Sequence, residues 1–151
     1  MDSVIIIGYS RHASVVCDIL RKIDRTIVGY CDQSEKQSNP YHLEYLGNED
    51  ALDSSQGKVF VAIGNNLLRE SIYYKISNRI EFANAVHPSA ILGEFCKVGH
   101  GIMIGANAIV NPLVSLGSFC IINTGAIIEH ECTIGDFAHI APGAVLAGNV
   151  S

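Results

Sequence analysis

The chain has 151 residues, about the length of one domain, and 48% of them are hydrophobic while 17% are charged, which argues against intrinsic disorder. Ten lysines and arginines stand against fifteen aspartates and glutamates, and a net charge of −5 argues against a nucleic-acid partner held through its phosphates. Apolar runs such as Val4–Ile7 are far shorter than the roughly 20 residues of a membrane span, and the N-terminus has no basic start, so we expect neither a membrane span nor a signal peptide.

The first half of the chain has the pattern of a small parallel α/β unit. Short apolar runs that end in polar residues or glycine predict strands, and aliphatic residues at helical spacing predict helices. In chain order these are a strand at 4–7, a helix at 12–23, strands at 27–30 and 59–63, and a helix at 67–79. The polar segment 33–47 contains Pro40 and is predicted to be a loop. This order of elements favours a Rossmann-like parallel sheet flanked by helices.

The second half of the chain repeats with a period of six residues. Ten positions spaced by six are all aliphatic: Leu92, Val98, Ile104, Val110, Leu116, Ile122, Ile128, Ile134, Ile140 and Leu146. The residue after each of them is mostly glycine, asparagine or alanine, and the residue two before is mostly small or β-branched. A period of six fits neither an α-helix nor a two-sided strand, whereas it fits a parallel β-helix of hexapeptides. An ordinary β-sandwich with frequent turns is the alternative.

In such a β-helix, three hexapeptides close one triangular coil, so residues about 18 apart stack on each other. We expect the aliphatic residue to point inward and the glycine or asparagine after it to take a turn with positive φ. His87 and Pro88 mark the change of pattern. The sequence therefore predicts an α/β domain at 1–86 and a β-helix domain at 87–151 with about three coils.

Three predicted strands end in residues suited to holding a ligand, because ligands of parallel sheets collect at the carboxyl ends of the strands. The first end leads through Gly8 into the helix at 12–23, whose free N–H groups suit a phosphate, and Ser10, Arg11 and His12 lie there. The second end carries Asp32 and Gln33, and the third carries Gly64, Asn65 and Asn66. Asp32 lies 24 residues after Gly8, near the place of an acid that meets a ribose, and we expect it to support no core. A structural turn beside a solvated aspartate is the alternative.

Two histidines stand in the repeat region, where aliphatic residues fill the inward positions. His130 is followed by Glu131, and a carboxylate beside an imidazole is typical of a general base, because it fixes the tautomer and raises the basicity. Neighbours on a strand point to opposite faces, so this contact requires a corner between the two residues. A surface imidazole without a catalytic role is the alternative for His130.

The cysteines indicate neither disulfides nor a metal site. Their number is five, which is odd, and none has C-x-x-C spacing, so we expect free thiols in a reducing cytoplasm. Cys96 and Cys132 share one position of the hexapeptide and are 36 residues apart, which is two coils. Two coils place them about 10 Å apart, too far to share a zinc ion, so we expect core packing and no metal.

Three segments together resemble one known family. The chain has I-I-I-G-x-x-x-H at 5–12, A-I-G-N-N-x-x-R at 62–69, and N-T-x-x-x-x-E-H-x-x-x-I-G-x-x-x-H at 123–139. With the hexapeptide repeat, this pattern resembles the nucleotide-sugar acetyltransferases, which include the NeuD-type sialic acid O-acetyltransferases and the PglD-type UDP-4-amino-sugar N-acetyltransferases. The resemblance covers the whole chain. It implies a left-handed β-helix, a homotrimer, and acetyl-CoA bound between adjacent β-helices.

The resemblance also implies a role for each candidate residue. His130 is similar to the family's proton acceptor, Glu131 to the acid that raises its basicity, and His139 to a histidine that contacts acetyl-CoA. The positions that hold the nucleotide-sugar correspond to Ser10, Arg11, His12, Asp32, Gln33 and Gly64.

The activity implied by the resemblance is acetyl transfer from acetyl-CoA to the amino group of a nucleotide-activated amino sugar, in the biosynthesis of surface glycans. O-acetylation of sialic acid or another sugar is one alternative. Relatives in this family continue for further coils, whereas this sequence stops at Ser151, so we expect a C-terminally truncated member. A truncated, non-catalytic binding or scaffold protein is therefore the second alternative.

Overall fold

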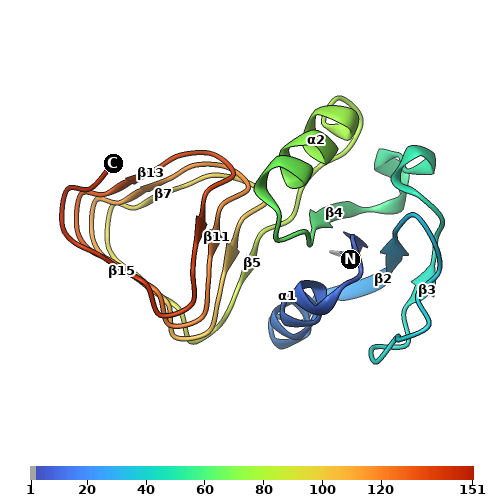
Figure 1. The fold of residues 1–151 in the computed structure, drawn as a ribbon, viewed down its shortest axis with the longest axis horizontal. Helices are drawn as coiled ribbons and strands as arrows, with labels where there is room; N and C mark the ends of the chain where they lie inside the picture. Colours follow the sequence, from blue (N-terminus) through green and yellow to red (C-terminus); the bar gives the residue numbers. More distant parts are fainter. Residues whose placement is uncertain (1–2) are drawn as a thin grey trace. The chain divides into compact units, whose positions relative to one another are not determined.

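The computed structural model describes residues 3–151 (Figure 1). The chain divides into two compact units, one ending at Ala83 and the other formed by Asn84–Ser151. This division lies just before the one expected from the sequence, because residues 85–86 already pair with a strand of the second unit. Within residues 3–151, no helix is both long and apolar enough to cross a membrane.

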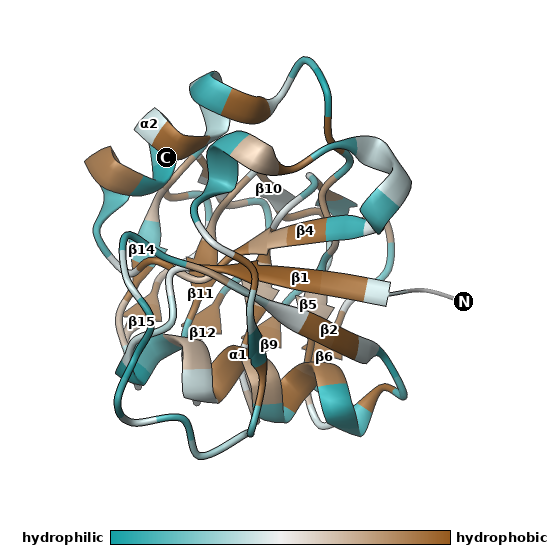
Figure 2. Ribbon diagram, turned by 90° about the vertical axis from the view of Figure 1, so that its right-hand side faces the viewer, coloured by the Kyte–Doolittle hydropathy of each residue, from teal (hydrophilic) through white to brown (hydrophobic). Residues whose placement is uncertain are grey.

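The first unit is a parallel four-stranded sheet with the strand order β3-β2-β1-β4. The strands are β1 (Ser3–Ile7), β2 (Thr26–Cys31), β3 (Glu44–Tyr45) and β4 (Lys58–Val61). The helices are α1 (Arg11–Lys22) and α2 (Asn66–Ile76), with two short 3₁₀ helices, η1 (Glu49–Ala51) and η2 (Ser54–Gln56). Strand β1 is central, and Figure 2 shows it as almost wholly hydrophobic. Its residues Val4–Ile7 are buried, as expected for a strand covered on both faces.

The α/β prediction is confirmed, with strand and helix ends displaced by a few residues, but the predicted loop at 33–47 is partly wrong. It contains β3, which pairs with β2 and extends the sheet. Two residues are too few to show a strand pattern in the sequence. The absence of a side chain at Gly29 leaves space for β3 to pair with β2, because a Cβ at this position would lie 2.6 Å from the carbonyl oxygen of Glu44.

The second unit is a parallel β-helix, which confirms the prediction from the six-residue period. Its two-residue strands form three parallel sheets with the orders β13-β10-β7, β14-β11-β8-β5 and β15-β12-β9-β6 (Figure 1). The strands are β5 (Ala85–Val86), β6 (Ile91–Leu92), β7 (Lys97–Val98), β8 (Met103–Ile104), β9 (Ile109–Val110), β10 (Ser115–Leu116), β11 (Ile121–Ile122), β12 (Ile127–Ile128), β13 (Thr133–Ile134), β14 (His139–Ile140) and β15 (Val145–Leu146). Residues 18 apart pair with each other, as Ile122 does with Ile104 and Ile140. The core is formed by the aliphatic positions from Ile104 to Leu146 and by the small residues two before them. Leu92 and Val98 of the first coil, which were expected to point inward, are exposed instead, at 39% and 38%.

The positive-φ turns are not where the sequence pattern placed them. They recur every six residues, but three residues after each aliphatic position: Phe95, Gly101, Asn107, Leu113, Phe119, Gly125, Glu131, Phe137, Gly143 and Asn149. Four of the five glycines that directly follow the aliphatic positions, Gly93, Gly99, Gly105 and Gly117, lie against the backbone of the next coil instead, whereas Gly135 has open space. A Cβ on Gly105, for example, would lie 2.7 Å from the backbone nitrogen of Thr124 in the next coil. Close contact between backbones, rather than backbone conformation, explains these glycines.

Candidate active site

A cavity of about 460 Å³ lies at the carboxyl ends of β1, β2 and β4 in the first unit. It brings together four of the six residues predicted to bind substrate there: Ser10, Asp32, Gln33 and Gly64. The full lining is Ile7, Gly8, Ser10, Asp32, Gln33, Glu49, Ile63, Gly64, Asn65, Leu68 and Ile72. The walls therefore combine aliphatic side chains with a few polar groups, as in most small-molecule sites. We call this the strand-end cavity.

A second cavity of about 480 Å³ shares Ser10 with the strand-end cavity. Arg11 and Lys36 give it two cationic side chains, and Tyr9, Ser14, Gln37, Ser38 and Pro40 complete its lining. We call this the basic cavity. Arg11 is thus placed beside the other predicted substrate-binding residues, whereas His12 lines neither cavity. The sequence did not identify Lys36 as a binding residue, because the segment 34–47 around it is polar and shows no regular pattern.

Asp32 also holds backbone in place, a role that the sequence analysis did not predict for it. Its Oδ2 accepts a hydrogen bond of 2.9 Å from the backbone N–H of Tyr9, and its Oδ1 accepts one of 2.8 Å from Gln33 N–H. The Nζ of Lys36 lies 3.0 Å from Oδ1. Burial by itself would raise the pKa of Asp32, but these hydrogen bonds, led by that from Tyr9, outweigh it and lower the pKa. The carboxylate therefore ties the turn after β1 to the end of β2.

Arg69, the last residue of the motif at 62–69, holds the loop that carries Gly64 along the strand-end cavity. Its side chain is 1% exposed. The guanidinium donates hydrogen bonds to the carbonyl oxygens of Ile63 (2.8 Å) and Gly64 (3.2 Å) and to Oδ1 of Asn66 (3.0 Å). Asn65 caps α2, since its side chain accepts a hydrogen bond from Leu68 N–H. Gly64 therefore lines the cavity on a loop that is fixed by buried hydrogen bonds.

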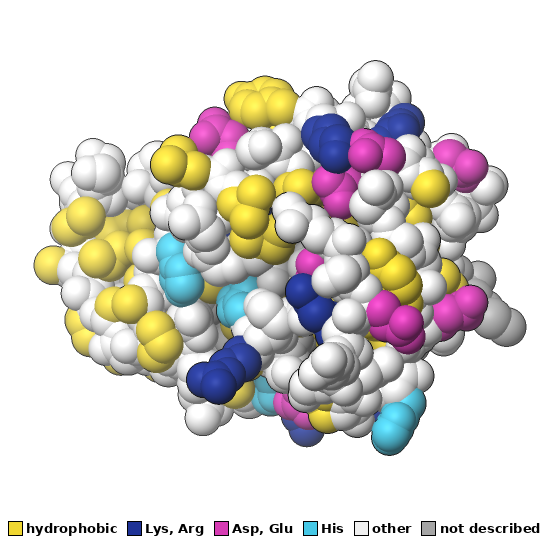
Figure 3. Space-filling model, turned by 45° about the vertical axis from the view of Figure 1, so that its right-hand side comes forward, with side chains coloured by type: hydrophobic (Ala, Val, Ile, Leu, Met, Phe, Trp, Pro, Cys, Tyr) yellow, Lys and Arg dark blue, Asp and Glu magenta, His cyan; other side chains and the backbone are white. Residues whose placement is uncertain are grey.

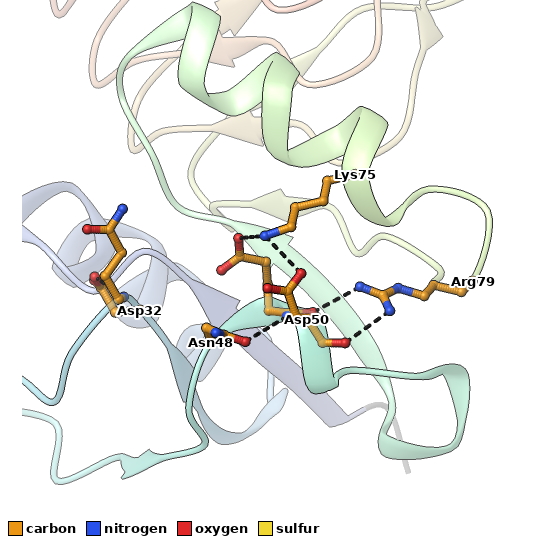
Figure 4. A network of polar contacts seen from close by, with 7 residues as sticks. Asp32, Asn48, Asp50, Lys75 and Arg79 are labelled. Carbon is orange, nitrogen blue, oxygen red and sulfur yellow. Dashed lines mark hydrogen bonds and ion pairs between the residues drawn. The ribbon is translucent and has the colours of Figure 1, made fainter.

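The wall formed by η1 is fastened to α2 and its C-terminal extension (Figure 4). Nζ of Lys75 lies 2.8 Å from a carboxylate oxygen of Glu49 and 2.8 Å from one of Asp50, and these contacts, Asp50 first, raise the pKa of Lys75. The guanidinium of Arg79 donates to the backbone carbonyl oxygens of the same two residues. Of these residues only Glu49 lines the strand-end cavity. Sequence reasoning missed Glu49, because no periodic pattern surrounds it.

His130 and Glu131 lie on the turn after β12, where the chain bends between two faces of the coil. Nδ1 of His130 is 3.0 Å from Oε2 of Glu131. The corner that this contact requires is present, because Glu131 has a φ of 61°. A carboxylate can only accept, so Nδ1 carries the hydrogen, and in the neutral imidazole Nε2 holds the lone pair. The imidazole is 60% exposed, so a ligand can reach it from solvent.

Gly148, one coil further on, leaves room for this imidazole. A Cβ on Gly148 would lie 2.8 Å from Cε1 and 2.9 Å from Nε2 of His130. The backbone also fixes the turn, since Asn149 N–H donates to the carbonyl oxygen of His130. The position of the ring is thus set by residues 18 and 19 places later in the chain, which the sequence analysis did not identify.

His139 lies in β14, and its partner in the preceding coil is Ile121 of β11. Its Nε2 is 3.0 Å from Nδ2 of Asn123. The orientation of this amide is determined, because Oδ1 of Asn123 accepts a hydrogen bond of 2.8 Å from Thr124 N–H. The amide nitrogen can only donate, so Nε2 of His139 accepts and its ring hydrogen is on Nδ1. Asn123 is therefore a positioning residue for His139.

Within residues 3–151, no group of three or more histidine, cysteine, aspartate or glutamate side chains is arranged to hold a metal ion. All five cysteines are free. Cys120 and Cys132 are buried in the β-helix, and the Sγ atoms of Cys96, Cys120 and Cys132 contact backbone carbonyl oxygens of the next coil. They pack in the core.

Comparison with known proteins identifies both units. Residues 3–76 match the PglD N-terminal domain, and residues 113–148 match the bacterial transferase hexapeptide (six repeats). The acetyltransferase domain of PglB from Neisseria gonorrhoeae FA1090 is 28% identical, with a TM-score of 0.89 over 99% of this chain and 75% of that chain. PerB from Caulobacter crescentus, solved in complex with CoA and GDP-perosamine, is 31% identical, with a TM-score of 0.86 over 97% of this chain and 72% of that chain.

Both solved structures extend over the two units, and they carry the same order of an α/β part followed by hexapeptide coils. The PglB domain has also been solved in complex with acetyl coenzyme A, and that structure is 27% identical to this chain with a TM-score of 0.88 over 98% of this chain and 74% of that one. On its fold, its two matched domains and these neighbours, the chain belongs to the PglD-type sugar acetyltransferases.

Proposed function

We propose that this chain transfers the acetyl group of acetyl-CoA to the amino group of a nucleotide-activated amino sugar, in the biosynthesis of surface glycans. The observation that carries the proposal is the His130–Glu131 pair, in which Nδ1 contacts the carboxylate and the ring is exposed on a turn of the β-helix, so that Nε2 of the neutral imidazole can accept a proton. Two structural neighbours support the choice of substrates, because PerB is complexed with CoA and GDP-perosamine and the PglB domain with acetyl coenzyme A.

In this reaction the sugar amine attacks the thioester carbonyl carbon. A C–N bond forms, the C–S bond breaks, and Nε2 of His130 takes the proton that the nitrogen loses. The sulfur of CoA leaves and receives that proton, so the histidine is regenerated. Glu131 keeps the hydrogen of the ring on Nδ1 and stabilises the imidazolium that forms. Backbone N–H groups of a neighbouring coil stabilise the tetrahedral oxyanion, and no covalent enzyme intermediate is required.

The remaining candidate residues bind the two substrates. His139 contacts acetyl-CoA, with its tautomer set by Asn123. The strand-end cavity, with Ser10, Asp32, Gln33 and Gly64, and the basic cavity, with Arg11, hold the nucleotide-sugar. The chain acts as a homotrimer in which acetyl-CoA lies between adjacent β-helices. Its five free thiols fit a reducing compartment, and we place the reaction in the cytoplasm.

The test is a steady-state assay with acetyl-CoA and nucleotide-linked sugars that present either an amine or a hydroxyl group. The wild-type chain should acetylate the amine. His130→Ala should lower kcat by about 10²–10⁴, the usual contribution of a general base, while acetyl-CoA binding measured by calorimetry stays unchanged.

His139→Ala is the matched control, because it removes a histidine of the same β-helix that has a different role. It should raise the KM for acetyl-CoA more than it lowers kcat. A His130→Ala variant with undiminished turnover would contradict the role of His130 as general base. Acetylation of hydroxyl acceptors alone would move the activity to O-acetylation, and failure of the wild-type chain to bind acetyl-CoA would favour a non-catalytic role.

A further inference from the structure

The lining of the strand-end cavity includes a carboxylate that comes from a short helix outside the sheet. Glu49 lines the cavity from η1, and its side chain is only 12% exposed. Aliphatic side chains of Ile63, Leu68 and Ile72 form other parts of the wall. A planar ring fits between apolar side chains, and a polar group at its edge decides which ring is accepted. The carboxylate of Glu49 is such a group.

This carboxylate is held in place from behind. One of its oxygens, Oε1, is 2.8 Å from Nζ of Lys75, and Arg79 donates to the backbone of the same short helix (Figure 4). Lys75 balances the negative charge, so an ionised Glu49 is tolerated at low exposure. An ionised carboxylate accepts hydrogen bonds and cannot donate any.

A pure acceptor discriminates among the nucleobases. Guanine presents two adjacent donors, N1–H and the 2-amino group, and these match the two oxygens of a carboxylate. Adenine and cytosine each place an acceptor nitrogen beside their amino group, and uracil places its single N–H between two carbonyl oxygens. Each of these three bases therefore donates one hydrogen bond to a carboxylate at best, as cytosine does through its amino group, whereas guanine donates two from one edge.

The charges of the two cavities favour one orientation of a nucleotide. Two carboxylates, Asp32 and Glu49, line the strand-end cavity, whereas Arg11 and Lys36 line the basic cavity, and Ser10 lies on both. Lys36 lies 3.0 Å from Asp32 and Lys75 lies 2.8 Å from Glu49, so these charges compensate each other, and the guanidinium of Arg11 attracts the phosphate groups to the basic cavity. The base then occupies the strand-end cavity, and the diphosphate extends past Ser10.

We infer that Glu49 makes the nucleotide site of this chain selective for guanine, so that its substrate is a guanosine-diphosphate sugar. The inference rests on the proposed function, because it assumes that a nucleotide-sugar occupies the strand-end cavity. It adds the identity of the base and the residue that selects it.

The experiment measures the binding of GDP, IDP, UDP and ADP to the full chain by calorimetry. GDP should bind about tenfold or more tightly than UDP and ADP, the range expected for one bidentate contact to a base. IDP lacks the 2-amino group, so it should bind several-fold more weakly than GDP. This comparison uses the unmodified chain and does not depend on the folding of any variant.

Glu49→Gln should lower the affinity for GDP about tenfold and leave that for UDP unchanged, since an amide presents a donor where the carboxylate presented an acceptor. Asp50→Asn is the matched control. Asp50 contacts the same Lys75 at the same 2.8 Å but does not line the cavity, so this variant should keep the preference for GDP.

The outcomes separate the inference from the proposed function. Tighter binding of UDP or ADP than of GDP, equal binding of GDP and IDP, or an unchanged GDP affinity in Glu49→Gln would each overturn guanine selection and leave a nucleotide-sugar substrate standing. Loss of GDP preference in Asp50→Asn as well would assign the effect to the fastening of η1 and not to the carboxylate in the cavity. If none of the four nucleotides binds, the nucleotide-sugar part of the proposed function fails, and the inference fails with it.

Discussion

Each of the two candidate histidines has a ring nitrogen whose state is set by one neighbouring side chain. Glu131 accepts from Nδ1 of His130, so Nε2 of that ring keeps its lone pair. Asn123 donates to Nε2 of His139, so the lone pair of that ring is already engaged. The two imidazoles are therefore chemically different, although both carry their hydrogen on Nδ1. His130 is suited to accept a proton, and His139 is suited to position a ligand.

Asn123→Asp should invert the tautomer of His139. The carboxylate has no hydrogen to donate, so Nε2 must carry one in order to keep the contact. Nitrogen-15 spectra recorded at a pH where the imidazoles are neutral distinguish the protonated from the unprotonated ring nitrogen. The wild-type chain should show an unprotonated Nε2, and the variant a protonated one. His87, whose Nδ1 accepts from Ser89 N–H, serves as the unchanged reference. Identical His139 spectra in both proteins would contradict the assignment.

Asp32 should contribute stability that depends on pH. Its folded-state pKa is lowered because hydrogen bonds, led by that from Tyr9 N–H, outweigh the effect of burial. A lowered pKa means that this stability is complete above the unfolded value of about 3.9 and is lost as the pH falls through the folded value below it. Asp32→Asn should lower the free energy of unfolding at pH 7 by about 1–3 kcal/mol, because Tyr9 N–H and Lys36 lose a charged partner.

Urea titrations at pH 7 and near pH 3 check this prediction. The difference between wild type and Asp32→Asn should shrink at the lower pH. Asp18→Asn is the control, since Asp18 pairs with Lys22 on an exposed part of α1 at 4.0 Å and should change stability little at either pH. An equal loss at both pH values would mean that the charge of Asp32 contributes nothing.

The elements of the β-helix are two-residue strands, so their stability comes from the stacking of coils and not from the strands themselves. Successive coils approach so closely that the position after each aliphatic residue often has no space for a Cβ. At Gly105 the nearest atoms are backbone atoms of Asn123 and Thr124, which cannot move aside as a flexible side chain would. Glycine is therefore required at such positions because the backbones of successive coils lie too close together for a Cβ.

Gly105→Ala should destabilise the β-helix by about 1–3 kcal/mol, because the new methyl group would lie 2.7 Å from Thr124 N. Gly135→Ala provides the matched control at the same position of the hexapeptide, where a Cβ would have no atom within 4 Å. Thermal unfolding followed by circular dichroism should show a lower midpoint for the first variant and little change for the second. Equal midpoints for the two variants would refute the stacking explanation.

At the scale of the whole molecule, large apolar side chains remain exposed on the β-helix of the isolated chain (Figure 3). They include Ile91, Phe95, Leu113 and Val145. Exposed apolar groups of this kind favour association with another protein surface. We expect a homotrimer, so sedimentation equilibrium should give three times the 16.3 kDa of one chain. A monomer that persists at high protein concentration would contradict this and would argue against an acetyl-CoA site shared between subunits.

Much of the site follows from motifs that the sequence displays. The strand ends predicted from short apolar runs place Ser10, Asp32, Gln33 and Gly64 around one cavity, because parallel strands present their carboxyl ends at the same edge of a sheet. Glu49 could not be found in this way. It enters the cavity from a 3₁₀ helix of three residues, and its position depends on Lys75 and Arg79, which lie far along the chain.

The sequence by itself determined most of the residues that face the core of each unit, since a period of six or a short apolar run indicates which side chains are buried, although Val28, Leu92 and Val98 are exposed. It did not determine which residues turn the chain, because that depends on how the 18-residue coils stack. Only the tertiary structure gave the positive φ at Glu131 that brings its carboxylate to His130, and the space at Gly148 that holds the ring. Burial is encoded locally, whereas the geometry of the site arises from contacts between residues that are distant in the chain.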